Sequence, residues 1–69
     1  MSRAYKLARH MSEMERISQN VLDAKTKLAQ RGLSPDDRER ASRTLLIEES
    51  LLDHETDKYL KLVAKEAQP

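Results

Sequence analysis

The chain has 69 residues, of which 36% are charged and 3% aromatic, and it contains no cysteine. Disulfides and cysteine-ligated zinc sites are therefore excluded, and a domain this small buries so little core that it often needs self-association or a partner. A sequence rich in Ala, Glu, Lys, Leu and Arg is typical of long helices and coiled coils. No apolar run is long enough to span a membrane and no secretory signal opens the chain, so we expect a cytoplasmic protein without membrane contact.

Charge is divided unevenly along the chain, although the formal net charge is only +1. Residues 1–31 carry seven basic and three acidic side chains, a balance of +4. Residues 32–69 carry six basic and nine acidic ones, a balance of −3. Folding the two halves against each other therefore gains long-range attraction, which salt weakens between exposed charges.

The first predicted element is a helix over about residues 3–31. Nothing in it breaks a helix, because it contains no proline, no glycine and few β-branched residues. Its apolar residues recur at the alternating three- and four-residue spacing of a heptad pattern. The stronger line is Leu7, Met14, Val21 and Leu28, and the weaker line is Ala4, Met11, Ser18 and Lys25. Ile17, Leu22 and Ala24 widen this apolar stripe.

A turn is predicted at residues 32–34, where one helix ends and the next begins. Gly32, the only glycine of the chain, suits the position just past a helix end that often needs a positive φ. Ser34 is a good N-cap, and Pro35 suits the first helical position. Asp36 and Asp37 place negative charge on the first helical turn, which the helix dipole favours. Such a short connection predicts two antiparallel helices, an αα-hairpin.

The second predicted helix covers about residues 35–67. Its stronger apolar line is Leu45, Leu52 and Tyr59, and its weaker line is Glu49, Thr56 and Val63. An antiparallel turn at Leu33 brings the stronger lines of the two helices together layer by layer. The predicted pairs are Val21 with Leu45, Met14 with Leu52, Leu7 with Tyr59 and Ala4 with Leu62. This agreement predicts one continuous hairpin, about 45 Å long at a rise of about 1.5 Å per residue.

The predicted hairpin leaves apolar residues that two helices alone do not cover. Leu22, Leu46, Leu60, Ala8 and Ala29 line one flank of the seam, while Ile47 and Leu51 lie on the far side of the second helix. The simplest cover is a second copy of the hairpin, which gives a homodimeric four-helix bundle. The alternative is a helix of another protein. We therefore expect an interface formed by Leu22, Leu46, Ile47, Leu51 and Leu60.

No residue pattern predicts a catalytic centre, a metal site or a cofactor. His10 and His54 each precede an acidic residue by three positions, the reverse of the Glu-x-x-His order in helical di-metal proteins. We interpret both as solvated histidine–carboxylate contacts, and we expect His10 to form a surface salt link with Glu55. An acidic ridge consists of Glu48, Glu49, Asp53, Glu55 and Asp57. Acid–base chemistry there would need a water-shielded pocket, and a two-helix chain offers no evident one.

Arginines around the turn give a second hypothesis, which is nucleic-acid binding by the dimer. The candidate phosphate contacts are Arg31, Arg38, Arg40 and Arg43. A separate basic group, Arg3, Lys6 and Arg9, lies near the start of the chain. Acidic residues alternate with the turn arginines, and the pI of 8.1 is below the basic footprint of nucleic-acid-binding domains. Nucleic acid therefore ranks below a protein partner.

Two stretches resemble known families of small helical hairpins. Leu52-Asp53 followed by Tyr59 is similar to the Leu-Asp…Tyr tail of the sporulation aspartyl-phosphate phosphatases, which implies a regulatory phosphatase that uses Asp53. The Ser-Gln-Glu of that family is replaced here by Glu49-Ser50-Leu51, and both predicted helices are too long. The residues from Arg16 to Leu28 resemble the first helix of type III secretion co-chaperones, which bury a helix of a needle subunit. Neither resemblance is specific enough to assign a family.

The sequence thus predicts a single all-α domain over residues 1–69, an antiparallel coiled-coil-like hairpin that dimerises. The function we favour is a non-enzymatic adaptor, co-chaperone or regulator that self-associates, buries a partner helix, or does both. Nucleic-acid binding and aspartyl-phosphate phosphatase activity are the two alternatives.

Overall fold

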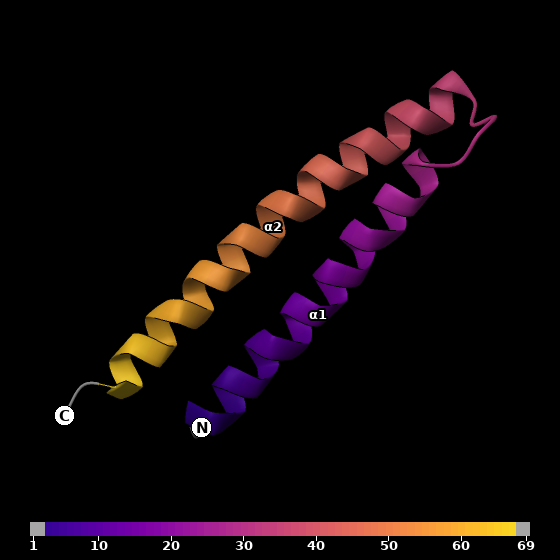
Figure 1. The fold of residues 1–69 in the computed structure, drawn as a ribbon. Helices are drawn as coiled ribbons and strands as arrows, with labels where there is room; N and C mark the ends of the chain where they lie inside the picture. Colours follow the sequence, from indigo (N-terminus) through magenta and orange to yellow (C-terminus); the bar gives the residue numbers. More distant parts are fainter. Residues whose placement is uncertain (1–2, 68–69) are drawn as a thin grey trace.

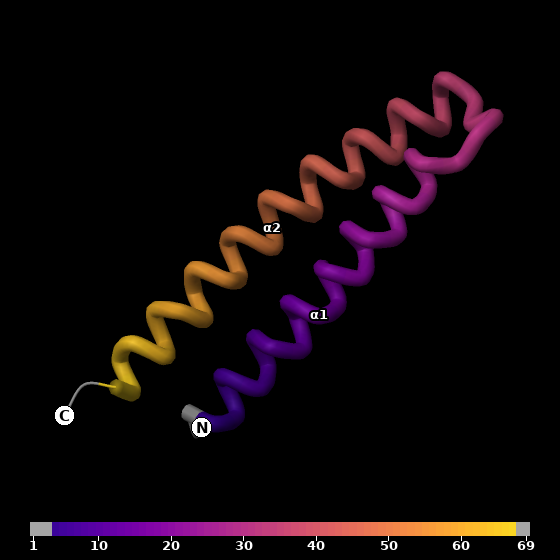
Figure 2. The backbone as a smooth tube through the Cα atoms, in the orientation of Figure 1, coloured from indigo at the N-terminus to yellow at the C-terminus, as the bar shows by residue number. Residues whose placement is uncertain are grey.

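Two long helices form an antiparallel hairpin in the computed structural model, which describes residues 3–67 (Figure 1). Helix α1 covers Arg3–Leu28 and helix α2 covers Pro35–Ala67. The start of α1 and the end of α2 lie at the same end of the rod, and the turn closes the other end (Figure 2). The predicted all-α hairpin is therefore confirmed. Neither helix, over the residues that the structure describes, combines the length and apolar character of a membrane-spanning helix.

The hairpin is a rod rather than a globule. Its dimensions are 55 × 16 × 15 Å, and its radius of gyration is 15.8 Å, compared with about 11 Å expected for a compact domain of this length. The accessible surface of 5571 Å² exceeds the value of about 4,450 Å² that size scaling gives for a compact protein of this mass. A large share of each helix surface is therefore in contact with solvent.

Helix α1 ends at Leu28, three residues before the predicted boundary at Arg31. The backbone N–H of Ala29 donates to the carbonyls of both Lys25 and Thr26, at 3.1 and 3.2 Å, and Gln30 N–H donates to Lys27 O at 3.1 Å. These bonds tighten the last turn toward 3₁₀ geometry, which ends the helix. The Arg38 guanidinium then donates to Leu28 O at 3.4 Å, so a side chain of α2 satisfies a carbonyl at the end of α1.

Helix α2 begins with the cap that the sequence predicts. The backbone N–H of Asp37 donates to Ser34 Oγ at 3.2 Å, and Arg38 N–H donates to Ser34 O at 2.9 Å. Ser34 is therefore the N-cap, and Pro35 occupies the first helical position, where no N–H is needed. Asp36 and Asp37 place their charges in the first turn.

A narrow seam between the helices forms the core. Ile17, Val21 and Ala24 of α1 and Ala41 of α2 are the buried residues of the described chain. The stronger predicted lines follow the same seam, because Leu7, Met14, Leu28, Leu45, Leu52 and Tyr59 are all half-buried. Near the turn the seam is filled by the two small alanines, whereas Ile17, only 2% exposed, fills its middle.

The weaker predicted line is wrong on α1, where Ala4, Met11, Ser18 and Lys25 are exposed. On α2 it is wrong for Glu49 and Val63, which are exposed, but not for Thr56, which is half-buried. The second line of the seam is instead His10, Ile17 and Ala24 on α1 and Ala41, Glu48, Glu55 and Leu62 on α2. The seam turns toward Ile17 and Ala24 because their side chains bury more apolar surface against α2 than Ser18 and Lys25 would.

Replacing Gly32 with alanine is expected to lower the free energy of unfolding by about 1 kcal/mol. Gly32 has a φ of 80°, and a Cβ added there would meet no atom within 4 Å, so the cost is conformational rather than steric. Urea denaturation at a fixed protein concentration measures it. Gly32→Asn is the control and should cost less, because asparagine tolerates positive φ better than alanine does. An unchanged stability in Gly32→Ala would contradict this account of the turn.

Candidate interaction surfaces

Large apolar side chains are more numerous on the surface of this hairpin than in its core. All five residues that the sequence assigns to an interface are exposed, by between 43% for Leu51 and 70% for Leu46. Tyr5, Met11 and Val63 are further exposed members of the same class. The exposure supports an interface, whereas the identity of whatever covers these residues stays a prediction.

The exposed apolar residues lie on two opposite flanks of the hairpin. Leu22, Leu46 and Leu60 each directly follow a seam residue of the stronger lines. In two antiparallel helices, residues at the same sequence offset from the seam lie on the same side of the hairpin. We call this side, which also carries Met11 and Val63, the apolar flank. Leu22 and Met11 line one groove together. Ile47 and Leu51 instead come one position before a seam residue of α2, so they lie away from the apolar flank. Leu51 lines a different groove with His10 and Glu55.

Acidic residues interrupt the apolar flank near its middle. Glu15, Glu49 and Asp53 are exposed there, and none of them makes an ion pair within the described residues. Three carboxylates on one face repel one another. A partner that covers this flank therefore benefits from a basic residue at its centre.

A basic groove runs along the opposite flank, toward the open end of the hairpin. Its cations are Lys6, Arg9 and Arg16 from α1 and Lys58, Lys61 and Lys65 from α2, and its apolar residues are Ile17, Leu51 and Leu62. Sequence reasoning found only the cations near the start of the chain as a group. The predicted register contained the missing signal, because it places the lysines near the end of the chain beside them.

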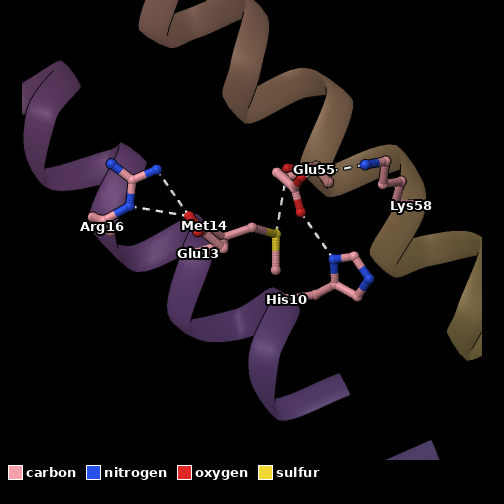
Figure 3. A network of polar contacts seen from close by, with 7 residues as sticks. His10, Glu13, Met14, Arg16, Glu55 and Lys58 are labelled. Atoms are coloured by element: carbon pink, nitrogen blue, oxygen red, sulfur yellow. Dashed lines mark hydrogen bonds and ion pairs between the residues drawn. The ribbon is translucent and has the colours of Figure 1, made fainter. Parts of the chain in front are cut away.

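A network of polar contacts crosses the seam beside this groove (Figure 3). His10 Nδ1 lies 2.9 Å from Glu55 Oε2, so the ring N–H donates to the carboxylate, and Lys58 Nζ lies 3.5 Å from the other carboxylate oxygen. The side chains of His10 and Glu55 are only 24% and 18% exposed. The predicted contact is confirmed, but it is part of the seam rather than a surface link. The His10 hydrogen bond, followed by the positive charge of Lys58, lowers the pKa of Glu55.

A second polar pair lies one turn along the seam. Thr56 donates its hydroxyl to Met14 Sδ at 3.5 Å. Glu48, by contrast, has a carboxylate oxygen, Oε2, that is shielded from solvent and has no hydrogen-bond partner in the described chain. The register places this carboxylate beside Ile17, so a charged group occupies a layer that an apolar side chain would fill better.

The turn arginines are partly engaged within the hairpin. Arg38 donates to Leu28 O, and Arg43 lies 2.6 Å from Glu39 Oε1. Arg40 and Arg43 share one shallow groove with Asp36 and Glu39, so the acidic residues offset their charge. Arg31 is exposed in the turn. The four candidate phosphate contacts therefore do not converge on one site.

The residues considered for metal binding and catalysis are scattered. His54 is exposed, and Asp57 pairs with Lys61 at 2.9 Å. Among the described residues, no cluster of His, Asp and Glu side chains is placed to hold a metal ion. Asp53, on which the phosphatase hypothesis depends, is exposed on the apolar flank.

No protein-family model matches this sequence, and no curated protein or solved structure matches it significantly.

The free energy of unfolding of the hairpin is expected to decrease as the pH is lowered, partly because Glu55 becomes protonated. Its pKa in the folded state lies below the ordinary value of 4.5. The stabilisation by the His10 and Lys58 contacts is therefore complete above about pH 4.5 and is lost as the pH falls through the folded-state pKa. Urea denaturation between pH 6 and pH 3 should show a smaller loss in Glu55→Gln than in the parent. Glu66→Gln, at an exposed carboxylate outside both flanks, is the control and should behave as the parent. Equal slopes in all three proteins would contradict the assignment.

Replacing Glu48 with leucine is expected to raise the free energy of unfolding by about 1 kcal/mol or more. The substitution removes a buried, unpartnered carboxylate oxygen and adds apolar surface to the seam. Thermal and urea denaturation at low protein concentration measure the change. Glu66→Leu, near the end of α2 and exposed, should change stability by no more than about 0.5 kcal/mol. A destabilised Glu48→Leu variant would show that this carboxylate has a favourable role in the seam.

Proposed function

We propose that this chain is a non-enzymatic interaction protein that self-associates through its apolar flank into a four-helix bundle. Its role is that of an adaptor, co-chaperone or regulator, and its working part is the surface of the helices rather than a pocket. We keep the cytosol as its proposed location, because a hairpin without cysteines gains nothing from an oxidising compartment.

The observation that carries the proposal is the imbalance between buried and exposed apolar side chains. Four of the described residues are buried, and two of these are alanines, whereas Leu22, Leu46 and Leu60 of the apolar flank are each more than half exposed. Full burial of one such side chain contributes about 1.5–3 kcal/mol. Covering the apolar flank therefore supplies stabilisation that the narrow seam does not.

The size of the exposed surface supports a second copy as the cover. The accessible surface exceeds that of a compact protein of the same mass by roughly 1,100 Å², and a standard protein interface buries about 800 Å² per partner. The flank is long, straight and shared by both helices, which suits another helical hairpin. The acidic residues at its centre are the part that such a dimer must separate or neutralise.

The two alternative functions have less support. Two of the four turn arginines already bond within the hairpin. Asp53 is exposed, and no cluster of His, Asp and Glu side chains among the described residues is placed to hold a metal ion. Nucleic-acid binding at the turn and phosphatase activity are therefore not part of the proposal.

Light scattering at several concentrations tests self-association. The parent is expected to have about twice the chain mass of 8.0 kDa, and Leu22→Asp/Leu46→Asp is expected to be monomeric, because both charges fall within the buried interface. Ile47→Asp, on the other flank, is the matched control and should remain dimeric. Circular dichroism on the same samples reports helix content. A parent that stays a folded monomer at every concentration would contradict the proposal.

A further inference from the structure

We propose that the basic groove is a docking site for an acidic amphipathic helix of a partner protein. The groove is defined by Lys6, Arg9, Arg16, Lys58, Lys61 and Lys65 with an apolar floor of Ile17, Leu51 and Leu62. It lies on the flank opposite the one that we assign to self-association. The inference therefore goes beyond the proposed function and does not depend on it.

The groove is continuous along the open half of the hairpin. One part has a volume of about 480 Å³ and the next about 330 Å³. Lys6, His10 and Lys58 line both parts, so the two form one channel between the helices. Figure 3 shows this region, with His10 of α1 and Lys58 of α2 both directed at Glu55.

Cations outnumber acids strongly in this channel. Its lining contains six Lys and Arg side chains but only two acidic ones, Glu13 and Glu55, whereas the whole chain has a net charge of +1. Both acids are already paired, Glu13 with Arg16 at 2.9 Å and Glu55 with His10. Lys6, Arg9 and Lys65 make no ion pair within the described residues. An acidic partner would satisfy them.

The spacing of the cations fits a helix lying along the channel. On α1 they occupy positions 6, 9 and 16, and on α2 positions 58, 61 and 65, so each rim repeats at helical spacing over two to three turns. The α1 rim extends about 15 Å and the α2 rim about 11 Å, given a rise of about 1.5 Å per residue. A partner helix of three to four turns could place acidic residues against both rims and an apolar stripe against Leu51 and Leu62.

The apolar floor distinguishes a helix from a nucleic acid. Single-stranded nucleic acids bind through stacking on aromatic side chains, and the only aromatic residues of the chain, Tyr5 and Tyr59, do not line the channel. Duplex phosphates would contact the rims and leave Leu51 and Leu62 unused. A helix that is both acidic and amphipathic uses both features of the channel.

Fluorescence anisotropy with the full chain and labelled synthetic peptides tests the inference. The probe is a four-turn helical peptide with leucines at the heptad a and d positions and glutamates at the flanking e and g positions. Two control peptides carry lysines in place of the glutamates, or serines in place of the leucines. The acidic amphipathic peptide is expected to bind, more weakly as salt rises; the basic peptide should not bind, and the serine peptide should bind at least about tenfold more weakly.

Paired substitutions locate the binding. Lys6→Glu/Lys65→Glu should weaken binding of the acidic peptide by about tenfold or more, because each charge reversal replaces attraction with repulsion. Lys25→Glu/Arg31→Glu makes the same change in net charge away from the channel and should leave binding within about twofold. Leu51→Ser tests the floor and Ile47→Ser is its control. All four altered side chains of the charge variants are exposed, so circular dichroism should show unchanged helicity.

Three results would overturn the inference. The first is absence of binding by the acidic amphipathic peptide. The second is equal weakening by the two charge-reversal variants, which would show a general electrostatic effect. The third is binding of the serine peptide or of duplex DNA as tightly as the leucine peptide, which would identify the channel as a non-specific anion-binding surface. All measurements use the same chain. A folded monomer that still binds the probe would therefore contradict the proposed self-association but not the docking site in the basic groove.

Discussion

The packing of α1 on α2 along one narrow seam holds this molecule together. Ile17 and Val21 supply the large buried side chains of that seam, and Ala24 and Ala41 fill it near the turn. Because the two helices touch along this one seam only, most residues away from it are exposed to solvent. The size of the seam therefore limits stability, and it also determines how much helix surface is available to a partner.

Polar groups make the seam weaker than its length suggests. His10 and Glu55 occupy one layer as a hydrogen-bonded pair, Thr56 and Met14 meet nearby, and Glu48 places an unpartnered oxygen in another layer. Such groups cost desolvation energy that pairing only partly returns. Paired groups of this kind also fix which residues face each other, since a shifted register would leave His10 and Glu55 unsatisfied. The hairpin thus combines a defined register with modest stability.

The two flanks of the seam differ in chemistry. One carries Leu22, Leu46 and Leu60 with acidic residues at its centre, and the other carries a cation-rimmed channel with an apolar floor. This division does not reflect the charge imbalance between the two halves of the chain, because each helix contributes three cations to the channel and both helices contribute acidic residues to the apolar flank. Under the two proposals, one flank binds a second copy of the hairpin and the other binds a partner helix, which is the property expected of an adaptor.

The sequence by itself determined the two helices, the turn and the stronger half of the seam. Gly32, Ser34 and Pro35 act locally, and the seven-residue spacing of Leu7, Met14 and Val21 needs no knowledge of the partner helix. Only the tertiary structure decided which neighbouring line completes the seam. Ile17 and Ala24 compete with Ser18 and Lys25 for the same space, and the outcome depends on how closely α2 can approach. The predicted register, which pairs Leu7 with Tyr59, already brings Lys6 beside the lysines near the end of the chain. Only the tertiary structure showed that these cations line one groove with Leu51 and Leu62, because that depends on how the helices pack.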